Sequence, residues 1–523
     1  MPVITTFSRQ SNQCFRLLPV LACSLIGLGN AQTCAAFDFN DVSDMAQELA
    51  RKGYSSPSNN LPSALSSLDY AHYKEITFKN EFSLWRGEQL PFDLGFYHEG
   101  MVYDTPVQIN EVVGDDVHPL QYSPDQFTYG SNPVNPEEFK SLGYAGFWVN
   151  YGANTDRKHQ VMAFLGASYF KAIGKDQHYG VSGRGIAIDT GLSSGEEFPR
   201  FKTFWIAKPN PSDRYLIIYA LLDSPSTTGA YRFVLRPGED TLVDVQSRLF
   251  LRHGVSKMGL APLSSMFYYG AVQPGNKDNY RPEMHSSEGL LVHDDEWIWQ
   301  PLINPRRLSI NTYETPHLQG FGLMQRNHDF DAYQDIDDRY DQRPSVWIEP
   351  TNTWGAGKLE LLQIPSPNET NENVITLWQP QTPPTVGQRY DYNYRMTFTT
   401  NESRLRLQPL AWVEQTRRSE GEIKQGNTLR KSDGSLAYIV DFRGDNLKSL
   451  SSDEVVSASI DTGDNTDLVG VEVKRQPVID GYRMALRVKV RDVNKPLDLK
   501  AFIKDGEGHR LSETWHMLKP ADV

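Results

Sequence analysis

The stretch YLIIYALLDSPSTTGAYRFVLRPGEDTLVDVQSRLFL, residues 215–251, decides the fold class. It contains three runs rich in β-branched and aromatic residues, separated by Ser224-Pro225 and by Pro237-Gly238. The third run alternates between apolar and polar residues, which is typical of a strand with one buried face. Its apolar face carries Val243, Val245, Leu249 and Leu251, and its polar face carries Asp244, Gln246, Arg248 and Arg252. We therefore predict consecutive antiparallel strands here.

Turn signals recur along much of the chain at intervals of about ten residues, as in all-β proteins. We therefore predict an all-β fold with a large antiparallel β-sandwich over residues 37–400. One helix is expected near its start, where Asn40 or Asp41 is a suitable N-cap and Gly53 a suitable C-terminal residue. The apolar residues that follow helical spacing are Val42, Met45, Ala46 and Leu49.

The C-terminal part has the pattern of a second, smaller β domain. Residues 401–411 are polar and contain Pro409, so they are a predicted linker. Beyond them, residues 412–523 contain several short alternating runs separated by turns. In one of them Met484, Leu486, Val488 and Val490 share a face. The number and spacing of these runs predict an immunoglobulin-like sandwich.

Residues 1–36 are typical of a secretory signal peptide. Arg9 and Arg16 precede an apolar run, residues 17–29, that is too short to span a membrane. Cleavage is expected after Ala36 or after Ala31, and a lipid anchor at a cysteine of this segment is a weaker alternative. Cys14, Cys23 and Cys34 are all the cysteines of the chain, so cleavage after Ala36 removes every thiol.

The charge balance argues against a nucleic-acid partner. The chain has 52 basic and 65 acidic residues, and removal of residues 1–36 takes away two arginines and no acid. A protein with this excess of negative charge repels phosphates. Hydrophobic residues make up 39% of the chain, which is enough for large packed cores.

Six aspartates lie within the thirteen residues from Asp329 to Asp341, mixed with aromatic and arginine side chains. Such a mixture suits a sugar, because hydroxyls pair with carboxylates and guanidinium groups and the C–H faces of sugar rings pack on aromatic rings. A solvated acidic loop is the alternative interpretation. Candidate substrate-binding residues in and beside this run are Arg326, Asp337, Asp338, Arg339, Asp341, Arg343 and Trp347.

Three further segments concentrate polar side chains close to tryptophans. They are residues 194–200, 281–289 and 369–373, and each is also compatible with an ordinary turn. Together they suggest the lining of a cleft for a long glycan, with Glu197, Arg200, Trp205 and Trp299 as further binding candidates. The glycine-rich run at 180–185 lacks the Walker lysine, so we interpret it as a turn.

These residues give the chain a resemblance to the periplasmic glucans biosynthesis protein G/D family (MdoG/OpgG), closer to the G branch. The resemblance covers almost the whole chain after residue 36. It rests on LPSALSSLDY from Leu61, FYHEGMVYDTPVQINEV from Phe96, LGASYFKAIG from Leu165, SGEEFPRFKTFWI, YALLDSPSTTGAY, IDDRYDQRPSVW and AWVEQTRRS.

The resemblance implies an anomer-inverting glycoside hydrolase or transglycosylase that acts on β-1,2-glucan during the synthesis of osmoregulated periplasmic glucans. The family's general acid lies in an E-T-N-D-N motif, and its position is held here by Glu372. A proton-relaying tyrosine in D-D-R-Y-D corresponds to Tyr340. The family's general base, an aspartate in H-D-S, is replaced by Ser286.

The serine leaves three hypotheses open, because a hydroxyl is a poor base near neutral pH and an inverting hydrolase requires one. A nearby carboxylate takes the proton through Tyr340 and water; the candidates are Glu288, Glu283 and Asp294. Alternatively, a sugar hydroxyl is the acceptor and the reaction is a transglycosylation. In the third hypothesis the protein binds or assembles glucan with little turnover. The resemblance implies no metal or organic cofactor, and it suggests the inner-membrane glucan synthase as a partner.

Overall fold

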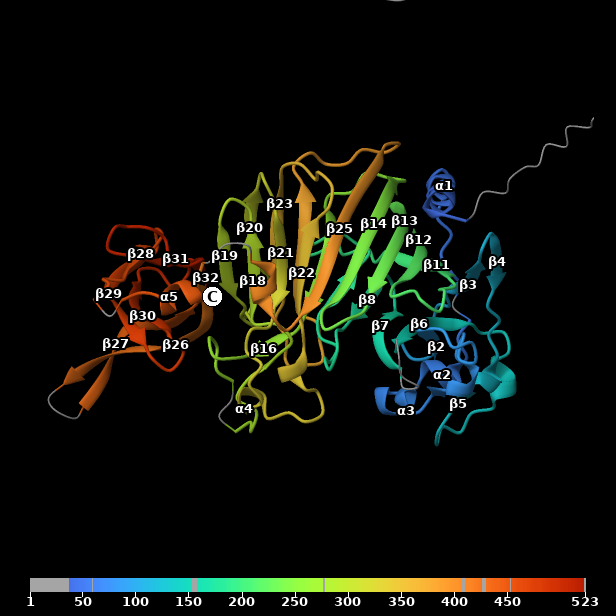
Figure 1. Cartoon of the computed structure of the whole chain (residues 1–523), viewed down its shortest axis with the longest axis horizontal. Helices are drawn as coiled ribbons and strands as arrows, with labels where there is room; N and C mark the ends of the chain where they lie inside the picture. The colour runs from blue at the N-terminus through green and yellow to red at the C-terminus, as the bar shows by residue number, and fades with distance from the viewer. Residues whose placement is uncertain are drawn as a thin grey trace, which may run out of the picture. The chain divides into compact units, whose positions relative to one another are not determined.

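The computed structural model describes residues 37–521 except 59, 153–157, 276–277, 407–409, 426–428 and 452. The predicted signal peptide therefore lies outside the described residues. Strands dominate the described part of the chain, as predicted, and most neighbouring strands are antiparallel (Figure 1). No described helix has the length and apolar composition needed to cross a membrane.

The first large sheet has ten strands. Along the sheet they are β2 (Phe92–His98), β6 (Tyr144–Tyr151), β7 (His159–Leu165), β8 (Tyr169–Ala172), β9 (Ser182–Arg184), β15 (Met258–Ser265), β24 (Val374–Pro380), β23 (Gly357–Gln363) and β20 (Ser309–Thr315), with β10 (Ile186–Ile188) also paired to β15.

The second large sheet has fourteen strands. In order they are β28 (Ser457–Asp461), β31 (Leu497–Lys504), β32 (Thr514–Lys519), β19 (Trp297–Pro301), β18 (Gly289–His293), β21 (Gly320–Met324), β22 (Ser345–Pro350), β25 (Arg389–Thr399), β14 (Thr241–Leu251), β13 (Thr227–Arg236), β12 (Leu216–Asp223), β11 (Arg200–Ala207), β3 (Gln108–Val113) and β4 (Asp116–Pro119). The opening stretch of sequence thus forms β12, β13 and β14, which pair consecutively as predicted.

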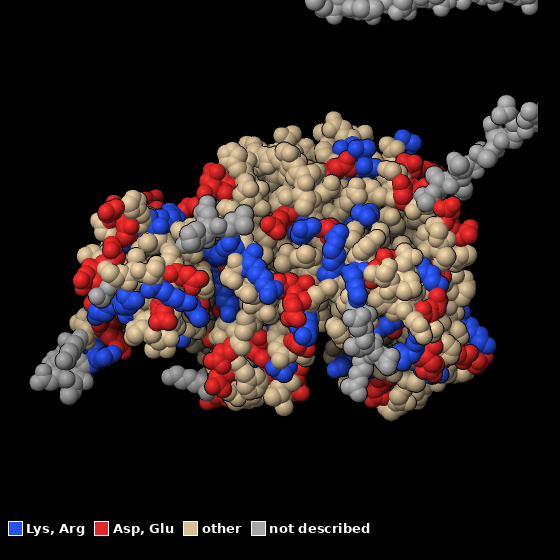
Figure 2. Space-filling model, in the orientation of Figure 1, with Lys and Arg blue, Asp and Glu red and all other residues tan. Residues whose placement is uncertain are grey.

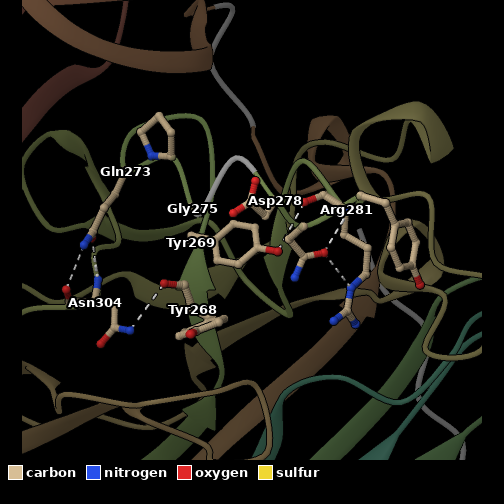
Figure 3. Close-up of a pocket in the computed structure, with 10 residues that line it drawn as sticks. Tyr268, Tyr269, Gln273, Gly275, Asp278, Arg281 and Asn304 are labelled. Atoms are coloured by element: carbon tan, nitrogen blue, oxygen red, sulfur yellow. Dashed lines mark hydrogen bonds between the residues drawn. The ribbon is translucent and has the colours of Figure 1, made fainter.

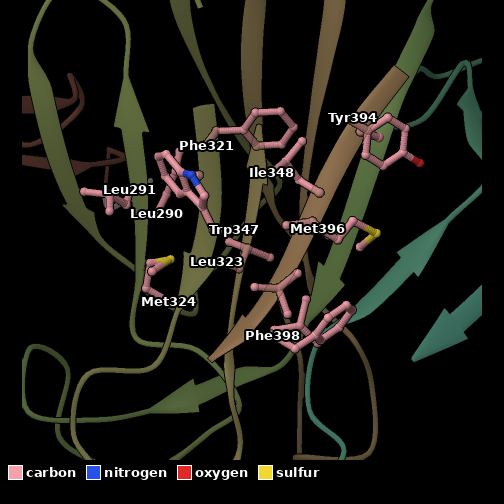
Figure 4. Close-up of a cluster of buried hydrophobic side chains, with 14 of the residues drawn as sticks. Leu290, Leu291, Phe321, Leu323, Met324, Trp347, Ile348, Tyr394, Met396 and Phe398 are labelled. Atoms are coloured by element: carbon pink, nitrogen blue, oxygen red, sulfur yellow. The ribbon is translucent and has the colours of Figure 1, made fainter. Parts of the chain in front are cut away.

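The two large sheets pack face to face through aromatic side chains. Phe147 on β6 lies 5.0 Å from Phe204 on β11, and Phe164 on β7 lies 5.2 Å from Phe233 on β13, measured between ring centroids. Further along the second sheet, buried side chains of β18, β21, β22 and β25 continue the same core (Figure 4). The predicted large antiparallel β-sandwich is therefore confirmed.

The first helix, α1 (Phe39–Ala50), packs on the outer face of β11 to β14. Its N-cap is Asp38 and its C-cap is Arg51. The two predicted N-caps, Asn40 and Asp41, therefore lie inside the helix, and Gly53 lies two residues beyond the C-cap. Val42 and Ala46 are fully buried against the sheet, in contact with a cluster that includes Trp205. The other described α-helices are short: α2 (Ser63–Ser66), α3 (Tyr70–Lys74), α4 (Phe330–Tyr333) and α5 (Asp445–Lys448).

A smaller sandwich forms the C-terminal part. Its four-stranded sheet contains β26 (Trp412–Gln425), β27 (Leu429–Arg443), β30 (Gly481–Val490) and β29 (Thr466–Gln476). This sheet packs on β28, β31 and β32, for example through the rings of Tyr438 and Trp515. Because β32 also pairs with β19, the C-terminal strands continue the fourteen-stranded sheet. The division into residues 37–400, 401–411 and 412–523 stays a prediction.

Two short strand pairs complete the fold. One joins β1 (Thr77–Phe78) and β5 (Phe127–Thr128), and the other joins β16 (Phe267–Tyr269) and β17 (Met284–His285). The glycine-rich run at 180–185 is not the predicted turn, because residues 182–184 form β9. Gly183 is needed there for packing, since a Cβ atom at this position would lie 2.6 Å from the ring of Phe170.

Candidate active site

Glu372 lies in the loop between β23 and β24 and meets two donors from the neighbouring strands. Its Oε1 accepts hydrogen bonds from Lys171 Nζ on β8 at 2.9 Å and from Ser182 Oγ on β9 at 2.6 Å. The Glu372 side chain keeps 29% of its surface exposed, so a ligand can reach it. These contacts hold the predicted acid above one end of the ten-stranded sheet.

Ser286 and Tyr340 are joined by one guanidinium group. Arg343 Nη1 donates to Ser286 Oγ at 2.5 Å, and the Arg343 guanidinium carbon lies 4.1 Å from the ring centroid of Tyr340. Burial lowers the pKa of Arg343, while the charges of Tyr340, Asp338, Asp335 and Glu372 oppose that shift. Arg343 packs against Gly180, and the Gly180 backbone oxygen accepts a hydrogen bond from Lys171, the ion-pair partner of Glu372. These contacts connect the three predicted catalytic positions.

Most of the acidic run is held in place by its own contacts. Asp329 caps α4, and Asp335 Oδ1 accepts the backbone N–H groups of Asp337 and Asp338 at 3.0 and 2.8 Å. Asp341 forms a two-bond ion pair with Arg339 at 2.9 and 2.7 Å. Two of the predicted sugar ligands, Asp337 and Asp338, have exposed side chains. The run is therefore an ordered loop, and only part of it is available to a substrate.

Arg281 connects this loop to the loop of Glu372. Its Nη1 lies 3.1 Å from Asp335 Oδ2, and its Nη2 lies 3.4 Å from Glu369 Oε1. Burial acts to raise the pKa of Asp335, but backbone N–H donors and Arg281 outweigh it and lower the pKa. The ionised Asp335 thus holds Arg281 between the two loops.

Tyr340 is buried beside a series of hydrogen-bonded side chains. Burial raises the pKa of the Tyr340 hydroxyl, so the phenol is neutral at ordinary pH. Gln325 Nε2 donates to Tyr333 Oη at 2.7 Å and to the backbone oxygen of Tyr340 at 3.3 Å. Gln325 Oε1 lies 2.9 Å from His285 Nδ1, which extends the series towards β17.

Two of the three alternative bases, Glu283 and Glu288, lie on the far side of these hydrogen-bonded side chains from Tyr340. Glu283 Oε2 lies 2.9 Å from His285 Nε2, and Glu288 Oε1 accepts the backbone N–H groups of Arg326 and Asn327. Burial raises the pKa of Glu288 to about 7. Glu283, His285 and Glu288 line a cavity of about 20 Å³, which has room for about one water molecule. A sugar chain cannot enter it.

Asp294, the third alternative base, lies elsewhere. It occupies the turn between β18 and β19, at the end of β18 that is remote from Ser286, and accepts the backbone N–H of His317 at 2.8 Å. Asp294, Asp295 and His317 have ligand atoms close enough together to hold a metal ion, although two of the three residues are exposed. This surface group is separate from Glu372.

Several residues predicted to bind sugar are instead part of the core. Trp205, Trp299 and Trp347 expose only 6%, 3% and 2% of their surfaces, so none offers an open ring face. The sequence could not exclude this, because a tryptophan beside a strand packs inward as readily as outward. Arg326 is also buried: its guanidinium pairs with Glu402 and Glu513 and lies 3.5 Å from the centroid of Trp299.

The remaining two candidates, Glu197 and Arg200, make other contacts. Glu197 Oε1 accepts hydrogen bonds from the backbone and the hydroxyl of Ser226. Arg200 Nη2 donates to the backbone oxygen of Pro106 and lines a cavity of about 670 Å³ together with Asp223. Neither residue has a described hydrogen bond to Glu372, Tyr340 or Ser286.

Two residues of the site, Lys171 and Ser182, were missed from the sequence, whereas Arg281 lies in the segment 281–289 that was predicted to line a cleft. Lys171 lies within the stretch from Leu165 that supports the resemblance, but it is 201 positions from Glu372. The space-filling view shows a hollow at the lower edge of one face, between the parts that carry α4 and α3 (Figure 2). Acidic and basic side chains lie close together along it, which suits a polar, uncharged ligand.

Comparison with known proteins identifies the family of the chain. The family model described as "Periplasmic glucan biosynthesis protein, MdoG" matches residues 37–518. Glucans biosynthesis protein G of Pseudomonas paraeruginosa is 49% identical over 490 residues, which are 93% of this chain and 93% of that protein. Proteins of the same name from Pectobacterium atrosepticum and Serratia proteamaculans are 48% and 49% identical, again over 93% of this chain and 94% of each relative.

Proposed function

The chain belongs to the periplasmic glucan biosynthesis MdoG family, and from that premise we propose that it cleaves or transfers β-1,2-linked glucan chains with inversion at the anomeric carbon. The observation that carries the proposal is the contact of Arg343 with both Ser286 and Tyr340. Arg343 also packs against Gly180, which Lys171 links to Glu372. Residues 1–36 serve as a signal peptide that is cleaved on export to the periplasm.

Glu372 acts as the general acid. It transfers its proton to the glycosidic oxygen while the bond between that oxygen and the anomeric carbon breaks. Oε1 faces Lys171 and Ser182, and a Glu372 carboxylate paired with Lys171 has no proton to give. A sugar hydroxyl therefore displaces Lys171, and Glu372 takes up a proton from solvent before the glycosidic bond breaks. Lys171 then donates to that hydroxyl. Before the sugar binds, the contact of Lys171 with Glu372 holds the acid in position.

The acceptor attacks the anomeric carbon from the opposite face and loses its proton on the side of Tyr340. Ser286 does not hold this proton near neutral pH, because a hydroxyl is a weak base. Glu283 and Glu288 are the remaining carboxylates close to this side, and they are separated from Tyr340 by His285, Gln325 and Tyr333. Proton removal is therefore slow for either acceptor, water or a bound sugar hydroxyl.

A binding role is the second candidate function. It is favoured by one observation: Arg343 fills the space beside Ser286 and is itself fixed by Asp338 and the ring of Tyr340. In this case the protein holds nascent glucan for the inner-membrane glucan synthase and catalyses little turnover. The exposed part of the Asp337–Arg343 loop and the hollow in Figure 2 serve either role.

Incubation with linear β-1,2-glucan distinguishes the candidates. The purified protein and its Glu372→Gln variant are compared by chromatography and mass spectrometry of the products. Shorter chains identify hydrolysis, and new linkages or rings identify transglycosylation. We expect the variant to lose at least about 10²-fold in rate, the usual contribution of a general acid. Binding without product in the wild-type protein would establish the second candidate, and full activity of Glu372→Gln would exclude Glu372 as the acid.

A further inference from the structure

A cavity of about 640 Å³ lies beside β16, next to the candidate active site but outside the contacts described above (Figure 3). Its aromatic lining comes from Tyr268, Tyr269 and Tyr280, and Arg281 lies at its border. The other lining residues are mostly polar and comprise Gln273, Pro274, Gly275, Asp278, Asn279 and Asn304. Planar polar groups and tyrosine rings thus line the same cavity.

One wall of the cavity is fixed by a reciprocal pair of hydrogen bonds. Gln273 Nε2 donates to the backbone oxygen of Asn304 at 2.9 Å, and the backbone N–H of Asn304 donates to Gln273 Oε1 at 2.8 Å (Figure 3). Asn304 Nδ2 also donates to the backbone oxygen of Tyr268. The wall is therefore preformed, which lowers the entropic cost of binding a ligand.

Two contacts tie this cavity to the loop that carries Glu372. Asn304 Oδ1 accepts the backbone N–H of Ser366, and Asn304 Nδ2 donates to the Ser366 backbone oxygen, both at 2.9 Å. Arg281, at the other end of the cavity, pairs with Glu369, three positions before Glu372. The cavity and the predicted acid thus flank the same loop, residues 364–373.

The lining fits a neutral sugar unit better than an anion. Tyr280 exposes 74% of its surface, and the Arg281 guanidinium lies 5.6 Å from its ring, so the ring is held at the cavity and available for stacking. The charge of Arg281 is already balanced by Asp335 and Glu369. Amide and hydroxyl groups nearby can pair with sugar hydroxyls, and tyrosine faces suit the C–H face of a pyranose.

We propose that this cavity is a distal glucose-binding subsite that holds part of the chain remote from the bond beside Glu372. The inference rests on the proposed function, because it takes its ligand from there. A subsite of this kind contributes only when the glucan is long enough to reach it. It therefore makes the protein select long chains over short ones.

Binding of linear β-1,2-linked oligosaccharides of short and long chain length, measured by calorimetry, tests the proposal. Tyr280→Ala removes the exposed ring without opening the core, and Tyr215→Ala, at the exposed residue just before β12, is the matched control. We expect Tyr280→Ala to weaken the binding of long chains about tenfold, as loss of one aromatic contact does, and to leave short chains unchanged. Tyr215→Ala should bind both like the wild type.

Equal binding of long chains by Tyr280→Ala and the wild type would overturn the distal subsite while leaving the proposed function intact. An equal loss for short and long chains would also overturn it, because Tyr280 would then contact the reacting sugars. If the wild-type protein binds no β-1,2-glucan of any length, the proposed function itself fails, and the subsite fails with it. Thermal unfolding of both variants checks that neither substitution has disturbed the fold.

Discussion

Arg343 donates a hydrogen bond to Ser286, so the position expected to hold a general base is in contact with a cation. An aspartate at position 286 would pair with this guanidinium and stay ionised at neutral pH. We therefore expect Ser286→Asp to raise the rate of β-1,2-glucan hydrolysis by about 10²-fold, at the lower end of what a general base contributes, because the ion pair weakens its basicity. The initial rate of release of shorter chains measures this.

Ser286→Asn is the control for this prediction. It has nearly the same shape as the aspartate and can accept a hydrogen bond from Arg343, but it takes up no proton. A similar gain in both variants would show that the effect comes from side-chain volume. The missing base would then not be the reason for slow hydrolysis.

Arg326 is predicted to be needed for stability and not for binding sugar. Its guanidinium and that of Arg406 are buried with the carboxylates of Glu402 and Glu513. Burial opposes ionisation of Glu402, but the two arginines outweigh it and lower its pKa to about 2. Arg326→Met leaves two buried carboxylates short of a partner, so we expect a loss of about 3–5 kcal/mol in the free energy of unfolding, measured with urea.

The exposed pair between Arg404 and Asp240 provides the comparison. Arg404→Met should cost no more than about 1 kcal/mol, because water screens a surface ion pair. Since the pKa of Glu402 is depressed in the folded state, its contribution is complete above the unfolded pKa of about 4 and disappears as the pH falls towards 2. Equal losses in the two variants at pH 7 would refute the buried network as a source of stability.

The long amphipathic strands were predictable from sequence, whereas the short strands near the site were not. β14 alternates between buried and half-buried residues from Thr241 to Leu249, so its period identifies it. β9 has only three residues, all buried, and two glycines flank or interrupt it, so it has the sequence of a turn. What makes Gly183 compatible with a strand is the ring of Phe170 against it, a contact that depends on the tertiary structure.

The residues of the candidate site also fall into some that the sequence identified and some that it did not. Glu372, Tyr340 and Ser286 were identified by resemblance, since a single carboxylate in a polar loop carries no periodic signal. The partners Lys171 and Ser182 come from strands that reach Glu372 only after the sheet has formed. Composition also failed to distinguish a stacking ring from a core ring, and the three tryptophans proposed as platforms are buried.

Glu288 is predicted to make stability depend on pH near neutrality. Burial raises its pKa to about 7, above the ordinary value near 4.5, so the folded protein binds more protons than the unfolded chain between these values. Stability therefore falls as the pH rises from about 4.5 to 7 and levels off above that, by up to about 3 kcal/mol from this group. Unfolding by urea at a series of pH values should show this slope.

Glu288→Gln should flatten that slope. The amide oxygen can still accept the backbone N–H groups of Arg326 and Asn327, so the local geometry is kept. The charges of His285, Glu283 and Arg326 also act on Glu288, so the comparison between variant and wild type isolates this residue. Asp295→Asn, at an exposed carboxylate in the turn after β18, serves as the control and should keep the wild-type slope. A slope that is unchanged in Glu288→Gln would show that Glu288 is not its source.

Gly289, the first residue of β18, is predicted to tolerate no larger side chain. A Cβ atom there would lie 2.2 Å from the indole of Trp299, and that ring is clamped from its face by Arg326 at 3.5 Å. Because neither group can move without disturbing the buried charges, we expect Gly289→Ala to reduce the free energy of unfolding by about 1–3 kcal/mol. Gly470→Ala in β29 meets nothing within 4 Å, so it should be neutral or stabilise by up to about 1 kcal/mol. Urea unfolding compares the two variants. If Gly289→Ala proved as stable as Gly470→Ala, Trp299 would have to move freely, and the packing between β18, β19 and Arg326 would be loose.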